Sequence, residues 1–205
     1  MESRPCHRHY DYNVPTTIHY PRIPVQDFLG LAAKSFPKKT ALSYFGSEIT
    51  FWELRCLVMR FANALGALGI KKGDRVGLHL PNCPQYPIAY YAVLCLGGIV
   101  VNLNPLYTPS ELQMMATTSG LTTLVTFDMA LPAIRTLCQA IQIPRVIATA
   151  VTDYIQGFPP SSAKSLDLEK GWLHFGELLE KSTSTKIPKV AFSPDDPAVI
   201  LFTGG

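Results

Sequence analysis

Between Asp74 and about Ala150, short apolar runs rich in β-branched residues alternate with segments of helical periodicity. The apolar runs lie at 75–80, 99–103, 121–127 and 145–148, and the helical segments lie at 84–96, 109–119 and 130–141. This alternation predicts βαβ units wound into a parallel sheet with helices on both faces, which is the α/β class. Ligands of such sheets bind beyond the carboxyl ends of the strands, so those ends are where we look for a site.

The chain before the alternating region predicts smaller elements. Residues 1–22 have no periodicity and are interpreted as an extended N-terminal arm, and 25–36 as a helix. Two short runs around Gly46-Ser47 predict a hairpin. Thr50 with Glu53 and Thr108 with Glu111 have the spacing of capping boxes, and Pro109 stands at the first helical position. For the helix at 84–96 we expect Asn82 or Cys83 as the cap, and a further short helix is expected at 175–180.

The last stretch, 195–205, places five apolar residues after a proline and closes on Thr203, Gly204 and Gly205. The pattern predicts a short strand, buried on both faces, that leads into a glycine turn. Paired glycines let the backbone approach a ligand and present successive N–H groups to an anion such as a phosphate. An ordinary turn after a strand is the alternative. Because a central strand rarely ends a chain, we expect the front part of a longer protein, cut inside a phosphate-binding loop.

Several functional classes receive no support from the sequence. The net charge is only +3 and the basic residues are scattered, so no nucleic-acid partner is expected. Five cysteines, none in a C-x-x-C pair, argue against a disulfide framework. The N-terminus has no signal-peptide run, and the cytoplasm is the expected location. Cys6, His7 and His9 have no second ligand pair, so we expect no metal there, and the lone His79 is interpreted as structural.

Five ordered motifs together resemble the adenylate-forming (AMP-dependent synthetase/ligase) superfamily. They are Ile49-Thr50-Phe51-Trp52-Glu53-Leu54, Gly73-Asp74-Arg75-Val76, Leu80-Pro81-Asn82-Cys83-Pro84, the run from Gly97 to Tyr107 with Glu111-Leu112, and the run from Asp195 to Gly205. Within the superfamily the chain is most similar to long-chain fatty acid CoA ligases, because of its Asn-Pro-Leu-Tyr-Thr-Pro-x-Glu-Leu segment and its Thr-Gly-Gly.

The resemblance implies a two-step reaction. ATP and a carboxylate give an acyl-adenylate and pyrophosphate, and the thiol of coenzyme A then takes the acyl group. Thr203, Gly204 and Gly205 match the opening of the family's phosphate loop, Thr-[Ser/Gly]-Gly-Thr-Thr-Gly-x-x-Lys-Gly, and are the cofactor-binding residues we expect. The rest of that loop, its lysine and the family's Mg2+ glutamate are missing from 1–205. We therefore expect no catalytic residue, no metal ligand and no activity in this stretch alone.

The implied division is an arm at 1–22 and an incomplete N-terminal AMP-binding domain at 23–205, which belongs to the family's large domain. Two alternatives remain open: an aryl-acid, amino-acid or luciferase-like adenylating relative, and a non-catalytic flavodoxin-like binding module. A homodimer through the arm is also left open. So is a peripheral contact of residues 154–170, which mix apolar and basic residues, with the inner face of a membrane.

Overall fold

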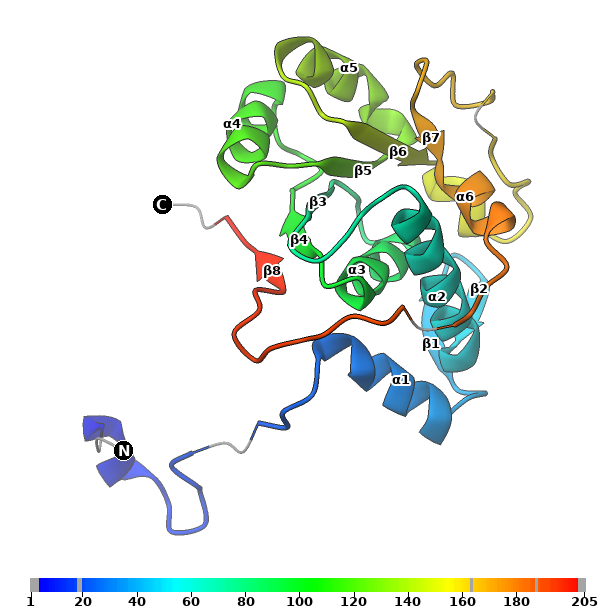
Figure 1. Ribbon diagram of the computed structural model, residues 1–205. Helices are drawn as coiled ribbons and strands as arrows, with labels where there is room; N and C mark the ends of the chain where they lie inside the picture. Colours follow the sequence, from blue (N-terminus) through cyan, green and yellow to red (C-terminus); the bar gives the residue numbers. More distant parts are fainter. Residues whose placement is uncertain (1–3, 18–19, 163, 187, 203–205) are drawn as a thin grey trace.

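The computed structural model describes residues 4–17, 20–162, 164–186 and 188–202. A six-stranded parallel sheet lies at its centre, in the order β7-β6-β5-β3-β4-β8 (Figure 1). The strands are β3 (Arg75–Leu78), β4 (Ile99–Asn102), β5 (Thr123–Phe127), β6 (Arg145–Thr149), β7 (Leu173–His174) and β8 (Val199–Ile200). The predicted α/β class and parallel sheet are confirmed. Only β7 was not predicted, because two residues carry no periodicity.

Helices cover the two faces of the sheet (Figure 1). α2 (Phe51–Ala67), α3 (Gln85–Cys95) and α6 (Phe175–Lys181) lie on one side, and α4 (Pro109–Ser119) and α5 (Leu131–Ala140) lie on the other. α1 (Val25–Ser35) packs against α2 and α3. Short 3-10 turns occur at η1 (Pro5–His9), η2 (Asp128–Ala130) and η3 (Val151–Tyr154), so the expected extended arm contains one helical turn. The predicted helices on both faces are confirmed.

The core lies where the central strands are covered from both sides. Val76 in β3, Leu124 in β5 and Ile147 in β6 are fully buried, as are Val58 and Phe61 in α2. Strands covered on both faces have apolar residues at successive positions rather than at alternate ones. That composition explains the continuous apolar runs of the alternating region.

The hairpin was predicted one residue out of place. β1 (Thr40–Tyr44) pairs antiparallel with β2 (Ser47–Thr50), and Ser47 pairs with Tyr44. The turn is therefore Phe45-Gly46, with positive φ values of 43° and 87°, rather than Gly46-Ser47. Two positive φ angles are those of the tight turn that matches the twist of paired strands.

Both predicted capping boxes are confirmed. The Thr50 hydroxyl accepts a hydrogen bond from the Glu53 N–H at 3.2 Å, and a Glu53 carboxylate oxygen accepts one from the Thr50 N–H at 2.9 Å. Thr108 and Glu111 repeat this arrangement at the start of α4. The cap predicted for α3 was wrong. Pro84 occupies the N-cap of that helix with no side-chain hydrogen bond, and the Cys83 carbonyl accepts the Tyr86 N–H instead.

We expect Thr50→Ala to lower the free energy of unfolding by about 1 kcal/mol, because it removes one half of the capping box at the start of α2. Urea denaturation followed by circular dichroism measures the change. Thr50→Ser keeps a hydroxyl acceptor and serves as the control. An equal loss in both variants would assign the effect to the threonine methyl group instead of the cap.

Candidate functional site at the carboxyl ends of the strands

The phosphate-binding residues predicted from the sequence, Thr203, Gly204 and Gly205, lie outside the described residues. The strand before them is described. β8 pairs in parallel with β4, with Val199 opposite Val100 and Ile200 opposite Val101. The chain therefore leaves β8 at the same edge of the sheet as the other carboxyl ends, next to the end of β4.

The predicted burial of this last strand was wrong. Val199 and Ile200 are half-buried, and Leu201 is 66% exposed. The reason is that β8 is an edge strand in the described part of the chain, with β4 on one side. The burial was predicted from the continuous apolar run, because such runs are typical of strands covered on both faces.

The strand order also fixes a crevice within the sheet. From β3 the chain goes to β4 on one side, and it later returns to β5 on the other side of β3. Loops that leave β3 and β5 therefore lead to helices on opposite faces, which makes this pair the topological switch point. The order β4-β3-β5-β6-β7 is the flavodoxin-like one, to which β8 adds an outer strand.

His79 fills this crevice. Its ring is 1% exposed, its Nδ1 lies 3.1 Å from the Thr126 hydroxyl, and it packs against the Phe127 ring at a centroid distance of 5.7 Å. Burial lowers the pKa of His79 to about 4, although the backbone of Pro105 and Asn104 favours the charged ring. The ring is thus neutral at pH 7 and has a structural place between two strands. A ligand at this point would have to displace a buried side chain.

Polar side chains to which the sequence assigned no role lie beside the end of β4. The Tyr86 hydroxyl donates to Asn102 Oδ1 at 2.8 Å, and burial raises the pKa of Tyr86 above its ordinary value. Asn104 Oδ1 accepts the Leu106 N–H at 2.9 Å and shapes the following loop. Asn102 is the polar residue in an otherwise apolar strand, and that interruption was the available signal. These groups border the place where the chain leaves β8.

A second polar group ties the loop after β6 to the sheet. Gln85, which is fully buried, donates to the Thr149 hydroxyl at 3.1 Å and to the Ala150 carbonyl at 2.7 Å. Asp153 accepts the Thr149 hydroxyl and the Ala150 and Ser161 N–H groups at 2.7–3.1 Å. No sequence motif predicts this group of contacts, because Gln85 at the start of α3 and its partners are more than sixty positions apart.

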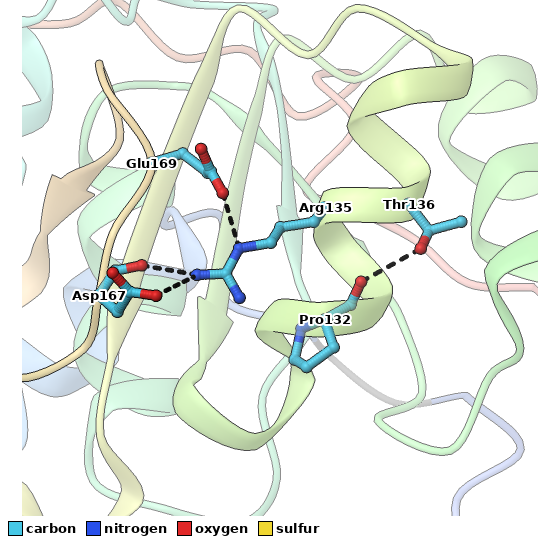
Figure 2. Close-up of polar contacts among 5 residues, drawn as sticks. All are labelled: Pro132, Arg135, Thr136, Asp167 and Glu169. Carbon is cyan, nitrogen blue, oxygen red and sulfur yellow. Dashed lines mark hydrogen bonds and ion pairs between the residues drawn. The ribbon is translucent and has the colours of Figure 1, made fainter.

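Further along, Arg135 of α5 fixes the same loop. Figure 2 shows its guanidinium between Glu169, whose carboxylate is 2.8 Å from Nε, and Asp167, whose carbonyl oxygen is 2.6 Å from one terminal nitrogen. Asp167 has a positive φ of 49°, and its carboxylate makes a longer contact of 3.3 Å. The segment at 154–170 is thus anchored at its far end to α5. Phe158 in this segment is 57% exposed.

Ser161 and His174 are 2.9 Å apart but do not form a nucleophilic pair. His174 Nδ1 accepts the Glu177 N–H at 3.2 Å, so the proton of a neutral ring lies on Nε2, which faces Ser161. An imidazole in that tautomer donates to the serine hydroxyl and cannot take its proton. The contact is a helix cap for α6 that also holds the loop.

Two of the cavities bordered by described residues lie at opposite ends of the strands. One of about 360 Å³ lies between β1 and the start of α3, on the ligand-binding side, and is lined by Leu42, Ser43, Tyr44, Asn82, Cys83, Pro84, Tyr86 and Pro87. A larger one of about 650 Å³ lies at the amino ends of β4 and β8 and includes Gly97, Gly98 and Ala198. Ligands of parallel sheets bind at the carboxyl ends, so size alone does not make the larger cavity the candidate.

Within the described ranges, no cluster of three or more His, Cys, Asp or Glu side chains is arranged to hold a metal ion.

The five cysteines are free, and burial raises the pKa of Cys83 to about 11 and that of Cys95 to about 12. Thiols with such pKa values stay protonated near pH 7 and are poor nucleophiles. Among the described residues, no helix is both long enough and apolar enough to cross a membrane.

Comparisons with known proteins agree with this architecture. Residues 30–205 match the sequence profile of the family described as AMP-binding enzyme. A long-chain fatty acid CoA ligase of Bacillus subtilis is 34% identical over all of this chain and 38% of its own length. A 4-coumarate CoA ligase of Oryza sativa is 29% identical over 95% of this chain and 33% of its own length.

A solved structure has the same fold. The long-chain fatty acid CoA ligase FadD1 of Archaeoglobus fulgidus superposes with a TM-score of 0.76 at 25% identity, over 96% of this chain and 37% of that protein. The chain therefore spans between 33% and 38% of the length of these relatives.

Proposed function

The chain belongs to the AMP-binding enzyme family, and on that premise we propose that it is the N-terminal part of an ATP-dependent, AMP-forming acyl-CoA ligase. In this reaction a carboxylate attacks the α-phosphorus of ATP, which gives an acyl-adenylate and releases pyrophosphate. The thiol of coenzyme A then takes the acyl group, and AMP leaves. The observation that carries the proposal is the parallel pairing of β8 with β4, which puts the carboxyl end of β8 at the ligand-binding edge of the sheet.

Thr203, Gly204 and Gly205 are proposed to supply the first backbone N–H groups that hold the phosphates of ATP. Such preorganised donors stabilise the charge that develops on the departing pyrophosphate. Mg2+ would spread that charge further, but we assign no ligand of Mg2+ and no catalytic residue to the described part of the chain. We keep the division into an arm at 1–22 and part of an AMP-binding domain at 23–205 as a proposal.

A long-chain fatty acid is the proposed substrate. Its support is that relatives from Bacillus subtilis and Archaeoglobus fulgidus carry that name and align over nearly all of the chain. An aryl acid is the second candidate, favoured by the identity of 29% with the rice 4-coumarate CoA ligase. We also propose a cytoplasmic protein whose segment 154–170, with its exposed Phe158, is the part suited to a peripheral contact with a membrane.

We expect the full-length protein that contains these residues to catalyse ATP–pyrophosphate exchange with palmitate at least about tenfold faster than with 4-coumarate, because an apolar pocket separates acids by that order. The measurement is radiolabelled pyrophosphate incorporated into ATP. Residues 1–205 alone should give no exchange, since most of the phosphate loop is missing from them.

Faster exchange with 4-coumarate would move the assignment to the aryl acids. Exchange with neither acid in the full-length protein would favour a binding module. Substantial exchange by residues 1–205 would overturn the assignment of the catalytic groups to positions beyond 205.

A further inference from the structure

We propose that Lys72 is a positioning residue for the phosphate loop, because its ammonium group fixes the register of β8 against β4 from the opposite end of the strand. This inference rests on the proposed function, since it concerns the placement of the loop that follows β8. Lys72 lies at the amino end of the sheet, in the turn before β3, whereas ligands of parallel sheets bind at the carboxyl ends.

The Lys72 ammonium holds two points of the turn that precedes β8. Its Nζ lies 2.6 Å from Asp196 Oδ2 and donates to the Ala191 carbonyl at 2.8 Å. The same Asp196 oxygen accepts the Ser193 N–H at 2.7 Å, so one carboxylate closes the turn and binds the lysine. Two hydrogen bonds lower the pKa of Asp196 below its ordinary value. The bond from Lys72 has the larger effect, and the bond from the Ser193 N–H has the next largest. The Asp196 carboxylate is therefore ionised at pH 7.

The backbone around Lys72 is itself fixed. The Gly73 N–H donates to the Gly97 carbonyl at 2.9 Å, and Gly97 has a positive φ of 69°. A Cβ atom at Gly97 would lie 3.0 Å from Lys72 Cγ and 3.1 Å from a methyl carbon of Val190. Three turns thus meet here, one before each of β3, β4 and β8, and the lysine stem passes through the space that the glycine leaves open.

The path into β8 makes this anchor important. The segment after α6 crosses over α2 on its way to β8 (Figure 1), where Asn63 donates to the carbonyls of Ser184 and Lys186. Within the described residues β8 pairs with β4 at two positions, and the Val100 N–H bonds to the Ala198 carbonyl at 2.9 Å just before them. So short a ladder gives little resistance to slippage.

A slip of one residue would move the chain by about 3.3 Å and turn each side chain of β8 to the opposite face. Phosphate-binding groups tolerate displacements of only about 0.5 Å. An anchor at the amino end of a short edge strand can therefore change ATP binding. The ion pair itself is partly exposed, with side chains 44% and 31% accessible, so it adds little to global stability. A change in ATP binding without a comparable loss of stability therefore distinguishes positioning from a merely structural role.

The test compares Lys72→Met, which keeps the apolar stem, with Lys71→Met, whose ammonium makes no ion pair in the part of the chain that the structure describes. In the full-length enzyme we expect Lys72→Met to raise KM for ATP about fivefold, with KM for the fatty acid unchanged and Tm lowered by no more than about 2 °C. Asp196→Asn should do the same, and the double variant should add nothing. An unchanged KM for ATP, or a loss that follows Tm, contradicts the proposal.

A second measurement separates this proposal from the proposed function. In the full-length protein, hydrogen exchange at the Val100 amide, observed by NMR, reports the bond to Ala198 without any catalysis. We expect about fivefold faster exchange in Lys72→Met and no change in Lys71→Met. Faster exchange in an enzyme that lacks ATP–pyrophosphate exchange would reject the function and retain the anchor. Equal exchange in the two variants would reject the anchor.

Discussion

Replacing Phe61 with alanine is expected to lower the free energy of unfolding by about 3–5 kcal/mol, the largest stability change that we predict for this chain. Phe61 lies in the middle of α2 and is fully buried, and its ring centroid is 4.1 Å from that of Phe175 at the start of α6. The truncation removes the transfer free energy of the ring and leaves a cavity between two helices that are anchored elsewhere, so the site collapses only in part.

Urea denaturation, followed by tryptophan fluorescence, measures this change. Phe28→Ala is the matched control, because Phe28 is also on a helix but is 48% exposed, and its truncation should stay within about 0.5 kcal/mol. A loss in Phe61→Ala as small as that in the control would mean that α2 and α6 repack around the missing ring. The double variant Phe61→Ala/Phe175→Ala should fall short of the sum of the two single changes, since the rings share one contact.

Local signals made much of the fold predictable. Helix starts at Thr50 and Thr108 depend on hydrogen bonds within three residues, and both capping boxes are present as predicted. The α/β architecture followed from the alternation of apolar runs, because each crossover must bury a helix on the sheet. One error was not local, because the half-burial of β8 depends on its place at the edge of the sheet. The hairpin turn lies one residue earlier than predicted, because Ser47 pairs with Tyr44 and belongs to the strand. The turn propensity of serine had placed Ser47 in the turn.

The site was predictable only in part. The apolar run before Thr203 was predicted to be a strand, and β8 pairs in parallel with β4, so its carboxyl end lies with those of the other strands. The glycine turn itself stays a prediction, because it lies outside the described residues. The polar contacts there join residues that are distant in sequence. Tyr86 meets Asn102, and Gln85 meets Thr149, through a helix and a neighbouring strand whose register no single motif determines. The ion pair of Lys72 with Asp196 spans more than one hundred positions and belongs to the same class.

The folded chain is expected to lose stability in acid through His79. Because His79 has a pKa of about 4 in the folded chain and an ordinary value of 6.5 when unfolded, the unfolded state binds the proton more readily between these pH values. The contribution is fully favourable above the unfolded pKa and is lost as the pH falls toward 4. Integrated over that interval, folding loses about 3 kcal/mol through this one ring.

His79→Asn removes the titration and keeps an amide close to the position of Nδ1, from which Thr126 can still be bonded. The variant starts less stable near neutral pH, since a smaller side chain occupies a fully buried site. The quantity to compare is therefore the change in the free energy of unfolding with pH, and not its value at one pH. Between about pH 7 and about pH 4.5, the free energy of unfolding should fall by about 2–3 kcal/mol more in the wild type than in the variant. Carboxylates titrate equally in both and cancel from the comparison. If the free energy of unfolding fell equally with pH in the two proteins, the buried His79 ring would have to bind its proton in the folded state. His79 would then do more than occupy space between β3 and β5.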